Sequence, residues 1–588
     1  MSSYLLGHLH GQRKPFSISR TSFDTHWHLI GGTGKGKTTA IHTMLHELLL
    51  DPTHDPCVII VDRLGGLSFD LLRWMTSDFC TQDVRDRLVY IEPARDGAVL
   101  GFNPLVHDSE GHAYYKVSRA TEIILRGWAS QNLSEMPRLA RWLFNSFLAC
   151  ALLKLTIADS VHLLLPGSSY HRPLLEALPP RLQAEWKELL HSHSGEVQRM
   201  LESARNRLKP FHEFPALRYM FGTTDNQLDI RRFMRQGKIV LLNLSPGNRI
   251  PDQIADAIGG LVLNEVLTTA RSLQPIDRTP TYVFLDEFQR FVGPDIETAI
   301  PEVRQLGIKL ILSHQSLSQL VRGDIDLTNL IFQCQSRMIF GVQGEDADIL
   351  AHELASLEFN PYHIKQELFT RHQRIAGHRI TELGSYSDAS SQAENWMEQY
   401  GSGWSRYDGQ SQREVDYRAR DKTRSEGSGR SGTESNGQGG SRSRTSSVGR
   451  HEQLVPIHED YLELASRTFM TFDEDRHVWA RDIRRAKRGE AFIRLVDAPD
   501  VLHIDVKRSA PGYLSWEPSE LAREMPEVLD DVERLIARNF QADHFSSPAE
   551  IDVQIEKRLT RVLAGREALP PFIAAGPSDG TGVKDPFL

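Results

Sequence analysis

The residues best suited to chemistry form a glycine-rich stretch that follows an apolar run and precedes a helix-compatible segment. In this context a G-x-x-x-x-G-K-T pattern turns backbone N–H groups towards a polyphosphate, at the positive end of the helix. We therefore expect a nucleotide-binding loop made by Gly31, Gly32, Thr33, Gly34, Lys35, Gly36, Lys37, Thr38 and Thr39. Lys37 would contact the β and γ phosphates of ATP, and the Thr38 hydroxyl would bind Mg²⁺.

A second group of candidates is the pair Asp286 and Glu287, which directly follows the strand-like residues 281–285. A buried strand that ends here would deliver both carboxylates to the mouth of the phosphate site. Asp286 would hold the Mg²⁺ shell and Glu287 would polarise the attacking water, because phosphoryl transfer needs an oriented nucleophile. Acidic residues at strand ends also cap helices, so this assignment depends on the phosphate loop upstream.

Gln315 lies just beyond the next apolar run, Lys309 to Leu312. A neutral amide at this place can bond the γ phosphate or the attacking water in one nucleotide state and release it in the next, which predicts a sensor. A solvent-facing loop side chain is the alternative, and only the neighbouring motifs argue against it.

The elements that position these residues suit a parallel sheet covered by helices. Unbroken apolar runs typical of buried parallel strands occur at Cys57 to Val61, Leu88 to Ile91, Ile239 to Leu244, Tyr282 to Leu285, Lys309 to Leu312 and Met338 to Gly341. Between them, residues 105–235 show apolar residues three and four apart, which indicates an all-helical insert. We therefore expect an α/β core in two parts, 1–104 and 236–383, around this insert.

The C-terminal third changes character. Residues 401–450 contain eleven Ser and ten Gly, and such a segment buries too little apolar surface to offset its conformational entropy. We expect residues 384–450 to be a disordered linker. Two strands of the core would return within 451–510, at Ala491 to Val496 and Val501 to Val506, and 511–588 would form a helical extension with a Pro/Gly tail.

Composition narrows the class of protein. The chain has 588 residues, 40% of them hydrophobic, and a formal charge of −9, which argues against coating nucleic acid with the whole surface but allows a local basic channel. Its four scattered cysteines suggest neither a disulfide framework nor a cysteine zinc site. Since no apolar stretch reaches the roughly 18 to 20 residues of a membrane-spanning helix, we expect a cytoplasmic protein.

Taken together, these motifs resemble those of the FtsK/HerA superfamily of hexameric motor ATPases, and most of all the TraG/TraD type coupling proteins of conjugation and type IV secretion. The resemblance rests on the phosphate loop, the apolar strand that ends in Asp62, Phe102-Asn103-Pro104-Leu105, Asp286-Glu287 and the segment from Arg304 to Gln315. It implies a RecA-like core with an inserted helical domain. It also implies that Arg304, eleven residues before the glutamine, acts as an arginine finger across a subunit boundary. Arg337 is a weaker candidate that could form only a structural ion pair.

The favoured interpretation is an ATP-driven motor that threads DNA through a homo-hexameric ring, assisted by a nuclease, a relaxase or a membrane-bound secretion complex. Two alternatives stay open: a secretion ATPase that exports protein, and a nucleotide-gated scaffold. Membrane-bound coupling proteins carry spanning helices before the motor, and the phosphate loop here begins about 30 residues from the start, so we expect a soluble relative. The basic residues between Arg481 and Arg488 could contact DNA, although a solvated helix face is the simpler explanation.

Overall fold

The computed structural model describes residues 3–128, 137–191, 195–224, 226–245, 249–291, 302–322, 325–393, 406–409, 424–430, 441–498, 500–508 and 510–564. Two compact units divide the chain. The first comprises Met1–Phe359 and Asp473–Leu588, and the second Asn360–Phe472.

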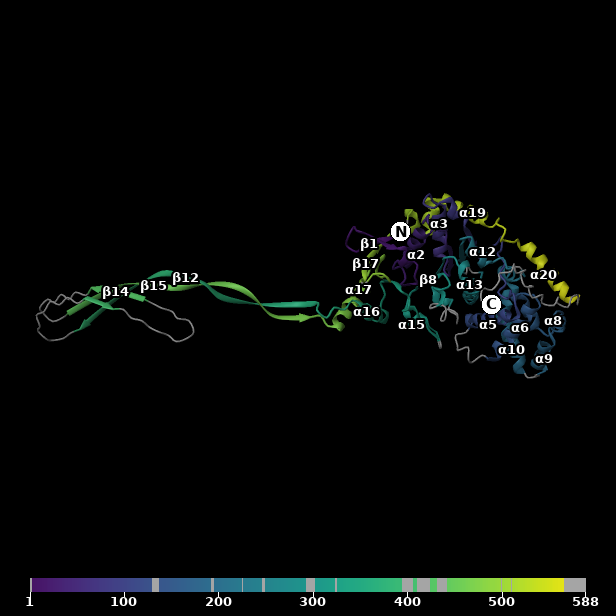
Figure 1. Ribbon diagram of the computed structural model, residues 1–588, viewed down its shortest axis with the longest axis horizontal. Helices are drawn as coiled ribbons and strands as arrows, with labels where there is room; N and C mark the ends of the chain where they lie inside the picture. Colours follow the sequence, from purple (N-terminus) through teal and green to yellow (C-terminus); the bar gives the residue numbers. More distant parts are fainter. Residues whose placement is uncertain are drawn as a thin grey trace, which may run out of the picture. The chain divides into compact units, whose positions relative to one another are not determined.

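An eleven-stranded sheet forms the centre of the first unit (Figure 1). Along the sheet its strands are β2 (Pro15–Ser19), β1 (Ser3–Leu9), β17 (Leu502–Val506), β16 (Glu490–Arg494), β11 (Ser336–Phe340), β3 (Trp27–Ile30), β8 (Ile308–His314), β7 (Thr281–Asp286), β4 (Cys57–Asp62), β6 (Ile239–Asn243) and β5 (Leu88–Ile91). The strands from β11 to β5 are parallel, whereas the other four join as antiparallel neighbours. The expected α/β fold with a mostly parallel sheet is confirmed.

Both faces of this sheet are buried, because alternate residues of each strand enter two separate apolar cores. On one face Val58 and Ile60 of β4 pack with helices α2 (Lys37–Leu49), α3 (Gly66–Thr76) and α19 (Pro526–Asn539). On the other, Ile59 and Val61 pack with α13 (Asp252–Ser272), α16 (Glu345–Glu358) and the helices that follow β5. Burial on both faces explains why the strand sequences are continuous apolar runs.

The described residues between 106 and 235 contain helices and no strand, as the sequence predicts. These helices are α5 (Glu110–Trp128), α6 (Pro137–Leu152), α7 (Ser160–Leu163), α8 (His171–Glu176), α9 (Pro180–His191), α10 (Gly195–Glu213), α11 (Pro215–Phe221) and α12 (Ile230–Arg235). After β17 the chain forms α18 (Pro518–Glu524), α19 and α20 (Pro548–Leu563). None of the described helices combines the length and hydropathy that a membrane crossing requires.

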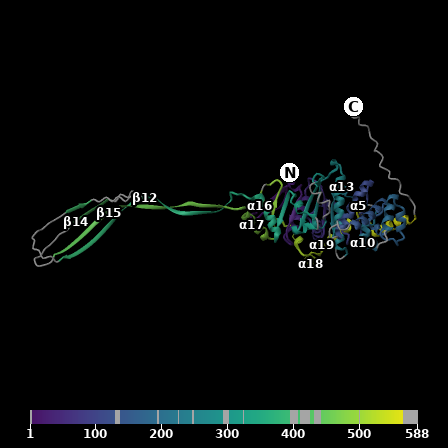
Figure 2. The same ribbon diagram turned by 90° about the horizontal axis from the view of Figure 1, so that it is seen from below.

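In the second unit the described parts of 384–450 form strands, against the expectation of a disordered linker there. Strand β12 (Ile364–Ala393) pairs antiparallel with β15 (Ser441–Phe469), and β14 (Arg424–Arg430) and β13 (Arg406–Gly409) extend the sheet. Both views show β12 and β15 as one long ribbon (Figures 1 and 2). Backbone pairing needs no buried side chains, so the Ser/Gly composition misled the prediction. The expectation for residues 394–405, 410–423 and 431–440 lies outside the described part.

Two boundaries change as a consequence. Residues 364–383 were expected in the core and 451–469 next to its returning strands, but both belong to the ribbon. The chain re-enters the first unit with helix α17 (Phe472–Arg485), and only then come β16 and β17, at the positions predicted for a strand pair.

Candidate nucleotide site

The phosphate loop connects β3, in the middle of the eleven-stranded sheet, to the N-terminus of α2. Gly34 and Gly36 adopt positive φ angles of 72° and 114°, which side-chain-bearing residues adopt only with strain. A Cβ atom on Gly31 would lie 2.5 Å from Cβ of Phe340, on the neighbouring strand β11. Glycine is therefore required at these positions by backbone conformation and by close packing.

The loop is supported by the neighbouring strands. The Gly32 N–H donates to the Gly341 carbonyl at 2.9 Å, and the Gly489 N–H donates to the Lys35 carbonyl at 2.8 Å. The Lys35 ammonium binds the Ala486 carbonyl at 2.9 Å. Lys35 is thus anchored to the backbone before β16, which leaves Lys37 as the lysine closest to the carboxylates.

Lys37 begins α2 and is buried. Its Nζ donates to the Gly31 carbonyl at 2.6 Å. Burial lowers the pKa of Lys37, and the charges of Glu287 and Asp286 act in the opposite direction. These opposing effects show that the lysine and the two carboxylates belong to one electrostatic site.

Three buried carboxylates, Asp62, Asp286 and Glu287, lie at the carboxyl ends of β4 and β7. Asp62 accepts hydrogen bonds from the backbone N–H groups of Leu64, Gly65 and Ser68 at 3.0, 2.9 and 2.6 Å, and so caps α3. For Asp286, burial, followed by the charges of Asp62 and Glu287, raises the pKa from 3.8 to about 6. A divalent cation would relieve this concentration of negative charge.

The donor set fits Mg²⁺, which prefers oxygen ligands from one or two carboxylates together with phosphate oxygens. Asp286 supplies the carboxylate, whose raised pKa reflects the negative charges around it. Thr38 lies in the first turn of α2 and is partly exposed, so its hydroxyl can reach a bound nucleotide. Thr39, beside it, is also partly exposed.

Glu287 is held on both carboxylate oxygens. Gln315 Nε2 donates to Oε1 at 2.5 Å, and Gln289 Nε2 donates to Oε2 at 2.6 Å. The Thr33 hydroxyl in turn donates to Gln315 Oε1 at 2.8 Å. Glu287 itself adopts the left-handed conformation with φ 54°, a strain of about 1 to 2 kcal/mol. Gln315 therefore links the phosphate loop to Glu287.

Two histidines, which the sequence analysis missed, lie behind this contact. His28 Nε2 and His314 Nε2 are 2.6 Å apart, and both rings are buried. His314 Nδ1 lies 3.0 Å from the Ser316 carbonyl, which can only accept, so Nδ1 carries the proton and His28 Nε2–H donates to His314. Phe288 packs edge-on against His314 with centroids 5.5 Å apart. The pair thus connects β3 to the turn that carries Gln315.

Arg304 is not brought to this pocket within one chain. It is exposed, its Nη1 donates to Gln335 Oε1 at 2.8 Å, and it precedes β8, whereas Gln315 follows β8. A strand of this length separates the two edges of the sheet by about 20 Å. Arg337 is almost fully buried, pairs with Glu353 and lies 4.7 Å from the Phe332 ring centroid, so it forms a structural ion pair.

Comparison with known proteins identifies one part of this region. Residues 280–367, which include β7, Glu287 and Gln315, match the family model described as the TraM recognition site of TraD and TraG. No curated protein is significantly similar to the chain.

Solved structures of conjugative coupling proteins are also similar. The bacterial conjugative coupling protein TrwB in an unbound form has 13% identity and a TM-score of 0.45, covering 87% of this chain and 91% of its own. TrwB with ADP and Mg²⁺ has 13% identity and a TM-score of 0.43, covering 84% and 87%. TrwB with a non-hydrolysable ATP analogue has 14% identity and a TM-score of 0.44, covering 86% and 90%. The match over residues 280–367 thus confirms that the chain resembles the TraG/TraD type coupling proteins in this part of its core.

Proposed function

We propose that the chain is an ATP hydrolase that works as a DNA-translocating coupling ATPase. The observation that carries hydrolysis is the position of Glu287: it is buried, fixed on both oxygens by Gln315 and Gln289, and electrostatically coupled to Lys37. A protein that only binds nucleotide as a gate needs no such carboxylate, which argues against the scaffold alternative.

In the proposed reaction, Lys37 exchanges its bond to the Gly31 carbonyl for phosphate oxygens of bound ATP. Thr38 and Asp286 would hold Mg²⁺, which would supply positive charge to the β and γ phosphates. Glu287 polarises the attacking water. Gln315, which bonds both Glu287 and Thr33, senses whether the γ phosphate is present.

We further propose that a neighbouring protomer supplies Arg304 to each pocket. Arg304 lies at the far edge of its own sheet and is exposed, so a role in hydrolysis requires a second subunit. A homo-hexameric ring would satisfy this need and provide a pore. The family matched over residues 280–367 is a TraM recognition site, and we propose that this segment contacts a relaxosome or secretion partner.

The choice between DNA and protein as the moved substrate is tested by steady-state ATP hydrolysis with duplex DNA, single-stranded DNA or an unfolded polypeptide. We expect DNA to stimulate turnover, with an effect that falls as salt rises because binding releases counterions. Stimulation by polypeptide alone would favour the protein-exporting ATPase.

A further inference from the structure

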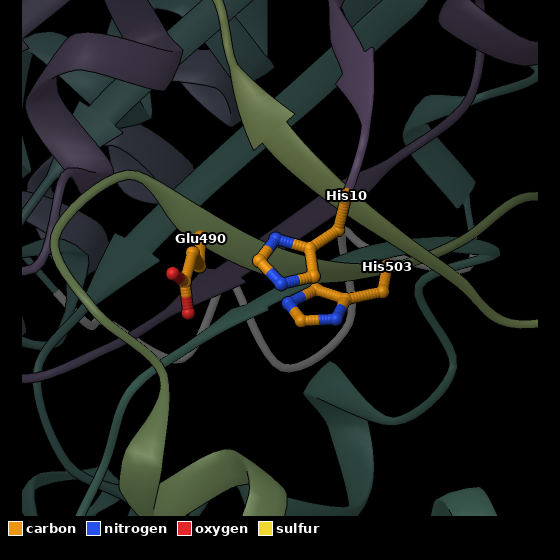
Figure 3. A group of neighbouring side chains, drawn as sticks. All are labelled: His10, Glu490 and His503. Carbon is orange, nitrogen blue, oxygen red and sulfur yellow. The ribbon is translucent and has the colours of Figure 1, made fainter. Parts of the chain in front are cut away.

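Apart from the nucleotide site, three metal-ligating side chains meet at the antiparallel end of the core sheet (Figure 3). His10 follows β1, Glu490 begins β16 and His503 lies within β17. Their ligand atoms all lie within 4.8 Å of one another. Segments from both ends of the chain therefore contribute to one cluster.

Sheet register explains why these side chains share a face. β17 lies between β1 and β16, and Asp505 of β17 is paired with Glu490. His503 lies two residues before Asp505, on the same face of the strand. His10 continues β1 beside it, with its N–H bonded to the His503 carbonyl at 2.9 Å. The cluster is thus built by backbone pairing in the ordered core.

The histidines present free nitrogen atoms. His10 Nδ1 donates to Asp505 Oδ1 at 2.9 Å, which leaves the Nε2 lone pair of that ring for another partner. A carboxylate on the second nitrogen is the usual way in which proteins orient a metal-bound histidine. His503 Nε2 is buried and has no hydrogen-bond partner within the described part of the chain. Glu490 Oε2 accepts the Lys487 N–H at 2.9 Å, and its other oxygen can bind a cation.

Packing holds the His503 ring in place. It stacks between His10 and Phe492, with centroids 3.9 and 4.4 Å away. Ligand atoms of a tetrahedral zinc ion lie about 3.4 Å apart. The exposed His10 and the half-buried Glu490 would therefore move towards His503. His10 would also tilt out of its stack with His503, because an imidazole lone pair lies in the plane of the ring.

We propose that His10, His503 and Glu490 bind a divalent transition metal of the zinc class, with Asp505 orienting His10. Two imidazoles and one carboxylate leave a fourth position for water. The ion joins the segment after β1 to the first residue of β16. Gly489, which precedes Glu490, donates its N–H to the Lys35 carbonyl in the phosphate loop. Metal binding at Glu490 therefore stabilises the backbone that supports this loop. The site does not depend on what the ATPase moves.

The test is calorimetric titration of the metal-free, full-length chain with Zn²⁺, together with the visible spectrum after Co²⁺ addition. We expect one site per chain, an intense four-coordinate Co²⁺ spectrum and a raised Tm with Zn²⁺. His503→Phe retains the aromatic stack and removes a ligand, so this binding step should disappear. Glu490→Gln should weaken it, and Asp505→Asn should lower affinity by about 10- to 100-fold.

His107→Phe is the matched control, because His107 lies outside the cluster and its Nδ1 lies 2.9 Å from the Leu105 carbonyl. It should bind Zn²⁺ like the wild type. The proposal is overturned if the wild type binds no Zn²⁺, or if His503→Phe and the wild type bind it equally. ATP binding is measured in every variant to show whether the fold survives. A variant that binds ATP but not Zn²⁺ tests the metal site alone, separately from the ATPase proposal.

Discussion

Glu287 is the residue on which the hydrolytic proposal depends most. Both of its oxygens are engaged by amides that follow β7 and β8, and its backbone is in a strained conformation. Strain of this kind persists only where the surroundings enforce it, and functional sites are where it collects. The carboxylate is therefore positioned before nucleotide arrives.

We expect Glu287→Gln to lower kcat by about 10²- to 10⁴-fold, because a neutral amide cannot polarise water as a base. The nucleotide Kd should stay nearly unchanged, since Lys37 and the glycine loop remain. Fluorescent nucleotide titration and phosphate release measure the two quantities. Glu527→Gln, at an exposed position of α19, is the control. A Glu287→Gln variant with wild-type turnover would remove the assigned role.

Asp286 makes stability depend on pH. Its pKa is about 6 in the folded chain and 3.8 in the unfolded chain, so the unfolded state loses the proton first. The protonated carboxyl stabilises the fold fully below about pH 4, and this contribution, about 3 kcal/mol, is lost as pH rises to 6. We expect Asp286→Asn to be more stable than wild type at pH 7 without metal. Urea unfolding at pH 4.5 and 7 measures this; an equal pH dependence in both proteins would contradict it.

At the scale of elements, β3 and β8 are coupled by the His28–His314 hydrogen bond. His314 also bonds the Ser316 carbonyl, so it brackets Gln315 from both sides. Small displacements of catalytic groups can lower rates by about 10²-fold. The histidine pair thus positions the turn after β8, which carries Gln315.

His28→Leu should reduce kcat by about 10-fold or more, with a smaller change in nucleotide affinity. His28→Gln keeps an N–H donor at a similar reach and should recover much of the rate. Steady-state hydrolysis and nucleotide titration of both variants test this. If the two substitutions reduce kcat equally while Tm is unchanged, the hydrogen bond does not position Gln315.

The ribbon of β12 and β15 is a separate element. The Met470 N–H donates to the His363 carbonyl at 2.9 Å, so its two ends meet. We expect a chain in which a short Gly/Ser turn replaces residues 364–469 to keep its Tm within about 5 °C and to bind ATP, because the ribbon forms its own compact unit. Calorimetry and nucleotide titration check this. Loss of folding would show that the first unit depends on the ribbon.

The sequence predicted those elements whose signal is local. Buried parallel strands such as β4 and β7 are continuous apolar runs, and the glycine-rich loop has a fixed spacing. The ribbon was missed because its strands carry polar and small residues and are stabilised by backbone pairing. Gln289 was missed because its contact with Glu287 depends on the turn after β7. His28 was missed because its partner His314 is set by the pairing of β3 with β8, which no spacing rule gives.

At the scale of the whole molecule, a single chain holds an incomplete hydrolytic site under our proposal. Lys37, Asp286, Glu287 and Gln315 gather at the carboxyl edge of the sheet, whereas Arg304 lies at the opposite edge. An arginine finger contributes about 10³- to 10⁵-fold to turnover. Activity should therefore depend on assembly and rise more steeply than linearly with protein concentration.

The most direct test is complementation between two inactive variants, Lys37→Ala and Arg304→Ala. Lys37→Ala should lose hydrolysis, and Arg304→Ala should bind ATP without turnover. In a mixture, an intact pocket of an Arg304→Ala subunit can receive Arg304 from a Lys37→Ala neighbour. We predict that mixing restores part of the wild-type rate. Full turnover by Arg304→Ala alone, or no recovery in mixed assemblies shown to form, would contradict a shared pocket.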